Sequence, residues 1–181
     1  IKPLLDFGHI HYGENKVQEA SLKWTETKKQ YKQIKLHMVG TLQSNKSKKA
    51  VELFDFIHSL DNKKLAESLS KAENKLNKKL KYFIQVNIGD ESQKSGVHLN
   101  DLENFYRFCR DEKKLNVIGL MCLPPNDGNE EKYFKIMSRE NKLLNLKELS
   151  MGMTADYLQA IKYDSTFLRI GSAIFGDRLK K

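Results

Sequence analysis

Short apolar segments alternate with longer amphipathic segments along the whole chain of 181 residues. Short runs rich in β-branched and aromatic residues predict strands, and the amphipathic segments between them predict helices. The predicted strands are residues 6–13, 35–40, 54–60, 81–88, 116–123, 147–152 and 166–176. The predicted helices are residues 13–30, 44–53, 62–76, 99–112, 130–144 and 154–164. This regular alternation indicates repeated βα units, whose strands lie parallel.

The predicted strands favour an α/β fold of the (β/α)8 TIM-barrel type, because the chain carries no glycine fingerprint of an open dinucleotide-binding sheet. A barrel of this type needs eight strands, one more than the pattern predicts. The opening segment IKPLL resembles the end of a helix, so we expect the first strand to lie upstream of Ile1. No linker divides the sequence, and residues 1–181 are predicted to form a single domain that is incomplete at its N-terminus.

Two predicted helix starts carry capping sequences. Asn62 or Asp61 is expected to cap the helix at 62–76, with a side chain that accepts a hydrogen bond from an early amide. Asn100 with Glu103 resembles a capping box, in which the two side chains bond each other's backbone N–H groups.

The charge of the chain leaves two interpretations of its surface. There are 32 Lys and Arg against 23 Asp and Glu, a net charge of +9. Lysines are scattered among acidic residues and Arg is scarce, which favours a solvated surface over a nucleic-acid groove. No apolar run is long enough to cross a bilayer, and Cys109 and Cys122 lie in different segments without another thiol. We therefore expect a cytoplasmic protein without a disulfide framework or a zinc site.

Two stretches near the end of the sequence, LSMGMT at 149–154 and FLRIGSAIFG at 167–176, each end an apolar run with small residues. Phosphate sites of barrels commonly use the carboxyl ends of the last two strands. Glycines there leave backbone N–H groups accessible, and hydroxyl groups add donors, so the pair predicts a phosphate site. Either stretch alone is more typical of an ordinary turn. The residues concerned are Ser150, Gly152, Thr154, Gly171 and Ser172.

Arg169 lies inside the last apolar run, between Leu168 and Ile170. Successive side chains of a strand point to opposite faces of the sheet, so Arg169 faces away from its two apolar neighbours. Its guanidinium is therefore predicted to point into the barrel mouth. Two roles stay open: a buried ion pair, or a cation held against a ring nitrogen or an anionic ligand.

Polar residues also occur in and after the earlier strands. Asn15 follows the first strand, where it either lends an amide to a planar ligand or caps the next helix. His37 lies within the second strand, a position more typical of a hydrogen-bonded core residue than of a ligand. His9 and His11 share one face of the first strand, but no third ligand has a suitable spacing, so no metal is expected.

Six stretches, in unbroken order from Phe7 to Gly176, resemble the pyridoxal 5'-phosphate (PLP) homeostasis protein family, which is related to the N-terminal barrel of alanine racemase. The stretches are YGENKVQEA, HMVGTLQSNK, IQVNIGDESQKSG, IGLMCLPP, LSMGMTADYLQAI and STFLRIGSAIFG. The resemblance implies a single-domain barrel that binds PLP at the carboxyl ends of its strands. It also implies a role in the intracellular homeostasis of vitamin B6 and amino acids, as a cofactor carrier without robust catalysis.

The resemblance also implies roles for individual residues. Arg169 would face the pyridine nitrogen, and Asn15 would lie beside the ring. In the family a Lys at the end of the first strand tethers the cofactor as an imine, and by the usual spacing this Lys falls upstream of Ile1. Whether Lys46 or Lys94 offers a secondary attachment point stays open. The residues implied to line the phosphate end of the site are Ser150, Met151, Gly152, Met153, Thr154, Gly171 and Ser172.

Two other functions stay open. A PLP-dependent amino-acid racemase needs two bases on opposite faces of its substrate, and alanine racemase takes one from a further domain of a partner subunit. No such domain is expected after Lys181, so a protein that is not an enzyme is favoured. A basic RNA-binding module would instead show salt-dependent affinity for nucleic acid. The expected partners are PLP and PLP-dependent apoenzymes that receive it, with no nucleic acid and no membrane, and the chain is expected to be a monomer.

Overall fold

The computed structural model describes residues 1–176, which contain one sheet of seven parallel strands in chain order. Each strand pairs with the next one along the chain, as the predicted βα units require. The domain predicted over 1–181 includes residues 177–181, which lie outside the described residues. The strands are β1 (His11–Glu14), β2 (Lys35–Met38), β3 (Phe56–Leu60), β4 (Lys81–Val86), β5 (Asn116–Cys122), β6 (Glu148–Met153) and β7 (Phe167–Arg169).

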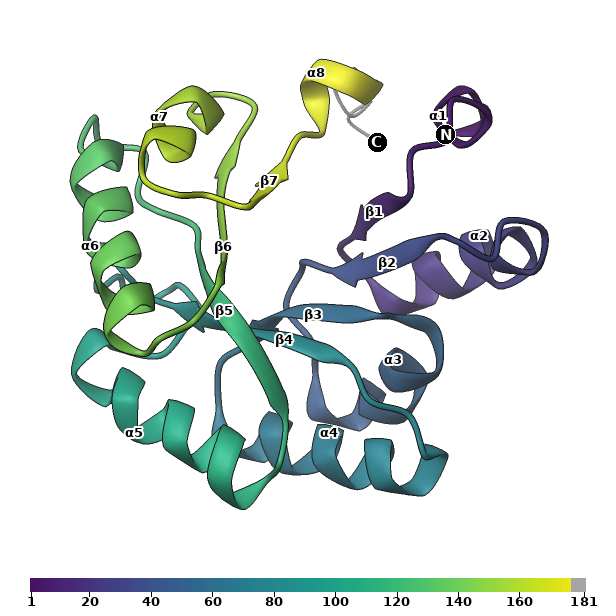
Figure 1. Cartoon of the computed structure of the whole chain (residues 1–181), viewed down its shortest axis with the longest axis horizontal. Coiled ribbons are helices and arrows are strands. Elements are labelled where there is room, and N and C mark those ends of the chain that lie inside the picture. The colour runs from purple at the N-terminus through teal and green to yellow at the C-terminus, as the bar shows by residue number, and fades with distance from the viewer. Residues whose placement is uncertain (177–181) are drawn as a thin grey trace.

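Helices connect the strands and cover the outer face of the sheet, which curves into an incomplete barrel (Figure 1). Short helices α1 and α8 lie at the two ends of the described chain. The α-helices are α1 (Lys2–Asp6), α2 (Val17–Gln30), α3 (Ser47–Leu53), α4 (Lys63–Leu76), α5 (Leu102–Arg107), α6 (Glu130–Leu143), α7 (Tyr157–Lys162) and α8 (Ser172–Phe175). Shorter helical turns are η1 (Ser44–Lys46), η2 (Leu99–Asp101) and η3 (Phe108–Glu112).

Strands β1 and β7 are the two edges of the sheet, and no strand among the described residues lies between them. The edges nevertheless approach each other, since the rings of His11 on β1 and Phe167 on β7 are 6.0 Å apart between centroids. Figure 1 shows α1 and α8, at the two ends of the described residues, on this side of the molecule. The predicted barrel architecture is therefore confirmed, with seven parallel strands.

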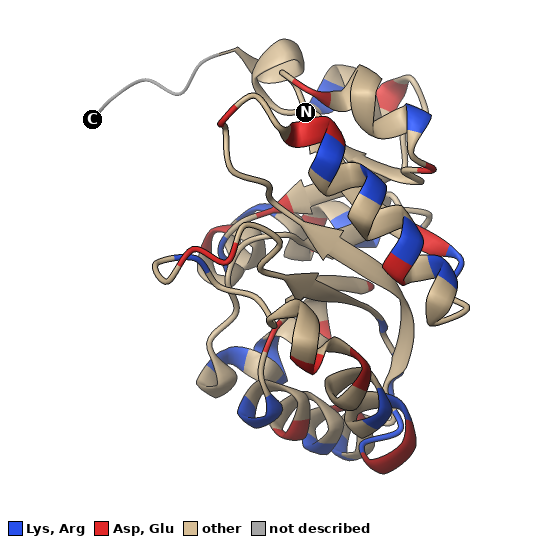
Figure 2. Cartoon of the chain, turned by 90° about the vertical axis from the view of Figure 1, so that its left-hand side faces the viewer, with Lys and Arg blue, Asp and Glu red and all other residues tan. Residues whose placement is uncertain are grey.

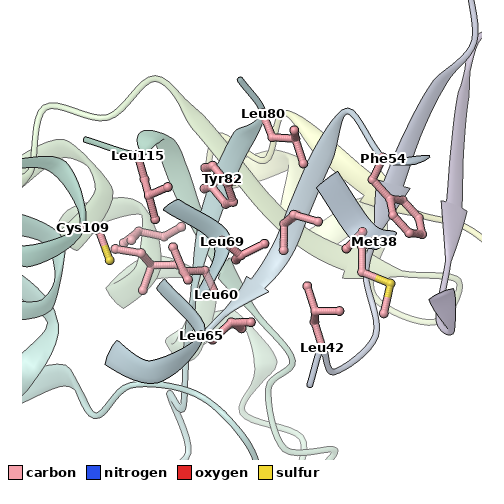
Figure 3. Close-up of a cluster of buried hydrophobic side chains, with 14 of the residues drawn as sticks. Met38, Leu42, Phe54, Leu60, Leu65, Leu69, Leu80, Tyr82, Cys109 and Leu115 are labelled. Carbon is pink, nitrogen blue, oxygen red and sulfur yellow. The ribbon is translucent and has the colours of Figure 1, made fainter. Parts of the chain in front are cut away.

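Most buried apolar side chains lie between the sheet and the helices, in a cluster that we call the outer core. Figure 3 shows part of it, where Leu65 and Leu69 of α4 pack against Leu60 and Tyr82 of the sheet. Burial of these side chains on folding contributes about 25 cal/mol for each Å² of apolar surface removed from water. The outer core therefore fixes the sheet on which the site is built.

Lys and Arg residues are interspersed with Asp and Glu residues along the helices, as the colours in Figure 2 show. No helix in the described part of the chain is long and apolar enough to cross a membrane. Cys109 and Cys122 are both buried free thiols.

Two strand boundaries differ most from the prediction. The strand predicted over 6–13 begins only at His11, because α1 extends to Asp6. The strand predicted over 166–176 ends at Arg169, because the chain turns at Gly171 into the short helix α8. Asn62 caps α4 as predicted, accepting a bond of 2.9 Å from the Leu65 N–H. The capping box at Asn100 and Glu103 is wrong: a 3-10 turn occupies this segment, and Glu103 pairs with Arg107 one helical turn later.

Candidate functional site

A second, smaller group of side chains faces the inside of the sheet, and we call it the barrel interior. Phe56, Phe83 and Met121 form its apolar part, with Phe167 packed against them. Strand alternation places these residues opposite to their neighbours in the outer core. The polar members of the barrel interior are His11, His37, His58, Ser150 and Arg169, linked by the hydrogen bonds described below.

The guanidinium of Arg169 points into the barrel interior, as predicted, and makes two hydrogen bonds there. Its Nη1 donates to Ser150 Oγ at 2.7 Å and its Nη2 donates to the Cys122 carbonyl at 2.8 Å. No carboxylate of the described residues forms an ion pair with it, so the buried ion pair considered from the sequence is not present there. Burial lowers the pKa of Arg169, although a guanidinium stays charged at neutral pH.

A row of three histidines continues from Ser150 across the barrel interior. His58 Nδ1 lies 2.9 Å from Ser150 Oγ, and His58 Nε2 lies 2.8 Å from His37 Nδ1. His37 Nε2 in turn lies 2.9 Å from His11 Nδ1 on the edge strand β1. His37 stacks on Phe56 and His58 stacks on Phe83, with ring centroids 4.1 and 4.2 Å apart. His37 and His58 are thus held by hydrogen bonds at both nitrogens and by stacking, whereas His11 joins the row through its Nδ1.

Burial keeps these histidines neutral. Desolvation, with a smaller contribution from His11, lowers the pKa of His37 to about 3. The pKa of His58 is also well below its ordinary value, chiefly because of burial, with smaller contributions from His37 and Arg169. Burial lowers the pKa of His11 as well. The prediction of a core role for His37 agrees with this environment, and the three rings form a row instead of converging on one point.

The two small-residue stretches lie side by side at the carboxyl ends of β6 and β7. Met153 of β6 is in register with Arg169 of β7. Just beyond these residues, the Ser172 hydroxyl lies 3.3 Å from the Thr154 hydroxyl and donates toward it. The two stretches predicted to meet are therefore adjacent, and their hydroxyl groups face one another.

An acidic side chain also lies at this position. Asp156 Oδ1 accepts a hydrogen bond of 2.6 Å from the Met153 N–H, one of the backbone groups predicted to face a phosphate. An anion that binds here therefore competes with a carboxylate for this donor. The sequence analysis assigned Asp156 no part in the site.

The two glycines of the site have different surroundings. A Cβ on Gly152 would lie 2.6 Å from the Ala160 Cβ, and Gly152 has a φ of +90°, so glycine is required here for the packing of α7 on β6. A Cβ on Gly171 would meet nothing within 4 Å. The open surroundings of Gly171 allow a ligand to approach its backbone. Glycine at position 152, in contrast, is explained by the packing of α7 on β6.

The remaining predicted site residues have different positions. Asn15 is exposed and directly follows β1, at the carboxyl end of that strand. The backbone of Asn15 lies close to Gly40, where an added Cβ would be only 2.3 Å from the Asn15 carbonyl oxygen. The Met151 side chain is buried in the outer core, so it faces away from the barrel interior. Lys46 ends η1, and Lys94 pairs with Glu91 at 2.5 Å. The cofactor roles of all these residues stay predictions.

Comparison with known proteins identifies the family. Alanine racemase, N-terminal domain, is the family that matches, over residues 2–179. A pyridoxal phosphate homeostasis protein of Pasteurella multocida is 36% identical, with 94% of this chain and 78% of that protein aligned. This chain therefore belongs to the alanine racemase N-terminal domain family, together with the pyridoxal phosphate homeostasis proteins. A pyridoxal phosphate homeostasis protein of Escherichia coli K12 is 32% identical, with 98% of this chain and 80% of that protein aligned.

Solved structures agree with the family assignment. PipY of Synechococcus elongatus without PLP superposes with a TM-score of 0.87 at 32% identity, covering 97% of this chain and 86% of PipY. PipY with PLP bound gives a TM-score of 0.85, covering 97% and 85% of the two chains. An alanine racemase of Clostridium difficile gives 0.74 at only 9% identity, covering 99% of this chain and 48% of the racemase, and thus shares the fold.

The sequence analysis did not predict that these histidines form a row. It singled out His37 and placed His11 on a strand face, but it gave His58 no role. A signal was available, because His11, His37 and His58 occur on three consecutive predicted strands. Consecutive strands of a parallel barrel are neighbours, so inward-facing histidines on all three are expected to touch.

Proposed function

We propose that this chain binds PLP at the carboxyl ends of β6 and β7 and serves in PLP homeostasis as a carrier without robust catalysis. Family membership and the PLP-bound structure of PipY support the choice of cofactor. The observation that carries the proposal is the position of Arg169. Its guanidinium lies in the barrel interior and forms no ion pair within residues 1–176, and the strands β6 and β7 that hold it lead into the facing hydroxyl groups of Thr154 and Ser172.

The described residues fit the two ends of this cofactor. Hydroxyl groups of Thr154 and Ser172, with the uncrowded backbone at Gly171, are suited to donate to a phosphate. Arg169 is suited to lie against the pyridine nitrogen, where a cation disfavours protonation of that nitrogen. When bound, PLP supplies an aldehyde that condenses with amines and a ring that withdraws electrons. An unprotonated ring withdraws electrons weakly, which suits a carrier better than a catalyst.

The finer parts of the proposal concern where the cofactor goes. A carrier releases PLP to apoenzymes, and through them it affects amino-acid pools. The mixed charges on the helices in Figure 2 give no support to the alternative of an RNA-binding module. The racemase alternative predicts conversion of L-alanine to D-alanine by the PLP-loaded protein at a rate above that of free PLP, whereas we expect none.

Binding is tested by titrating the protein with PLP and following absorbance and fluorescence, with Arg169→Glu as the decisive variant. Replacing the cation by a carboxylate should weaken binding by roughly tenfold or more, or shift the absorption of the ring, since one charged hydrogen bond is worth about 1.5–3 kcal/mol. Arg139→Glu is the control, because Arg139 is an exposed residue of α6 that pairs with its neighbour Glu140.

A version extended upstream of Ile1 tests the expected tether. We expect it to retain the mass of the cofactor on a single Lys after borohydride reduction. Equal PLP affinity of the wild type and Arg169→Glu would place the cofactor elsewhere, and an extended protein that binds no PLP would reject the carrier function.

A further inference from the structure

The row of side chains from Arg169 to His11 raises a question of donors and acceptors. A neutral imidazole carries one N–H, so one of its nitrogens donates and the other accepts. Three neutral histidines in a row therefore have two consistent arrangements. Either every ring carries its proton on Nε2 and donates away from Ser150, or every ring carries it on Nδ1 and donates toward Ser150.

Ser150 decides between the two arrangements. Its side chain is fully buried, and within the described residues its hydroxyl has two partners, Arg169 Nη1 and His58 Nδ1. Arg169 can only donate, so the hydroxyl oxygen accepts from it. If His58 also donated, the hydroxyl hydrogen would have no acceptor in a buried site, which costs free energy. If His58 accepts, the Ser150 hydroxyl hydrogen has an acceptor, and each hydrogen bond of the row joins one donor to one acceptor.

We infer that Arg169 fixes the direction of a hydrogen-bonded row, in which Ser150 donates to His58, His58 donates to His37 and His37 donates to His11. All three rings then carry their proton on Nε2. His11 lies on the edge strand and is exposed in the described chain, so its own Nε2–H can be hydrated. The inference rests on the proposed function only where it concerns the cofactor.

This direction also explains how a partly buried cation exists without an ion pair among residues 1–176. In the inferred arrangement the Nδ1 lone pair of each ring faces the Arg169 side of the row. The negative ends of the imidazole dipoles therefore point toward the guanidinium and stabilise its positive charge. The Cys122 carbonyl adds a further acceptor at 2.8 Å. His58 and His37 are thus positioning residues, which act on the site by holding Arg169 through Ser150.

The direction is measured on the ligand-free protein by long-range ¹H–¹⁵N correlation spectra of the histidine rings at neutral pH. We expect His11, His37 and His58 each to show a protonated Nε2 and an unprotonated Nδ1. His98 is an internal reference, because its Nδ1 faces the Asp90 carboxylate at 2.6 Å outside the row. Protonated Nδ1 atoms in His37 and His58 would overturn the inference.

Arg169→Met tests what sets the direction. Without the guanidinium the Ser150 oxygen is free to accept from His58, so the shifts of all three rings should move together toward a mixture of tautomers. Ser59→Ala is the matched control, since Ser59 is a buried neighbour of His58 whose hydroxyl has no hydrogen-bond partner among the described residues. Unchanged tautomers in a folded Arg169→Met protein, with the His98 signals in place, would show that Arg169 does not set the direction.

His37→Phe tests the positioning role without altering Ser150 or Arg169. The aromatic ring can keep the stacking on Phe56 while the row is broken. We expect PLP affinity to fall by roughly threefold to tenfold, the usual size of one lost hydrogen bond. Unchanged affinity would overturn the positioning role. If the wild type itself binds no PLP, the proposed function fails, whereas the tautomers of the ligand-free protein still decide the direction of the row.

Discussion

The outer core and the barrel interior differ in the partners that compensate their charged side chains. In the outer core, the fully buried Glu73 carboxylate accepts from the Leu80 N–H, the Tyr82 hydroxyl and Lys79 Nζ, at 2.7, 2.9 and 3.0 Å. In the barrel interior, Arg169 has only neutral partners. A carboxylate in a direct ion pair has its charge compensated within the fold, whereas a cation held by neutral dipoles keeps its charge available for a ligand.

The apolar content of the two regions differs in the same way. The outer core joins residues from nearly every strand and helix, while the barrel interior has three buried apolar members, Phe56, Phe83 and Met121. Histidine rings take the places that aliphatic side chains occupy on the outer side. We conclude that the outer core supplies most of the stability and that the barrel interior gives up apolar contacts for a polar row.

The largest effect is expected from a cavity in the outer core. Leu69 of α4 is fully buried, so Leu69→Ala should lower the free energy of unfolding by about 3 kcal/mol, from lost transfer free energy and the cavity left behind. Urea unfolding followed by circular dichroism measures the loss. Leu158→Ala is the control on an exposed position, with 64% of Leu158 accessible, and should change stability by about 0.5 kcal/mol or less. A loss as small for Leu69→Ala would contradict the stabilising role of the outer core.

An effect that grows as the pH falls is expected from the barrel interior, and at pH 5 it is smaller than that of the cavity, at about 2 kcal/mol. His37 has a pKa of about 3 in the folded chain, against an ordinary value of 6.5. The unfolded chain therefore binds a proton that the folded chain does not. The stability linked to this group is complete above pH 6.5 and is lost as the pH falls toward 3, by about 1.4 kcal/mol per pH unit.

His37→Phe should remove this part of the acid sensitivity. The free energy of unfolding, measured between pH 7 and pH 4, should then change less steeply with pH, by an amount that corresponds to the uptake of about one proton fewer. Ser59→Ala, which removes no titratable group, should keep the slope of the wild type. If His37→Phe keeps the wild-type slope, protonation of His37 is not what destabilises the folded chain in acid.

Much of the fold could be predicted because parallel strands buried on both sides leave a strong apolar signal. The order of strands and helices follows from it, and the meeting of the stretches near Thr154 and Ser172 follows from their place after neighbouring strands. The end of β7 was misplaced, because the apolar residues Ala173, Ile174 and Phe175 continue the pattern of a strand while the backbone turns into α8.

The polar row could not be predicted in the same way. It depends on the register of three strand pairs and on the ring orientations of His11, His37 and His58, which no local pattern specifies. The bond between the Met153 N–H and Asp156 was missed for a similar reason. This bond spans three residues within a turn. From the sequence alone, an acidic side chain so close to a predicted phosphate site would be expected to repel the phosphate, and only the turn geometry shows that it accepts a backbone hydrogen bond.

This turn gives the smallest of the expected effects. Asp156→Asn keeps an oxygen that can accept from the Met153 N–H but removes a negative charge from the place where we propose that a phosphate binds. Affinity for inorganic phosphate and for PLP should rise by about threefold at low salt, since a nearby exposed charge contributes on the order of 1 kcal/mol, and the gain should shrink at high salt. Asp164→Asn is the matched control, because Asp164 pairs with Lys142 beyond the end of α7 and should leave both affinities unchanged. Weaker phosphate binding by Asp156→Asn would mean that the carboxylate organises the turn for its ligand instead of repelling the phosphate.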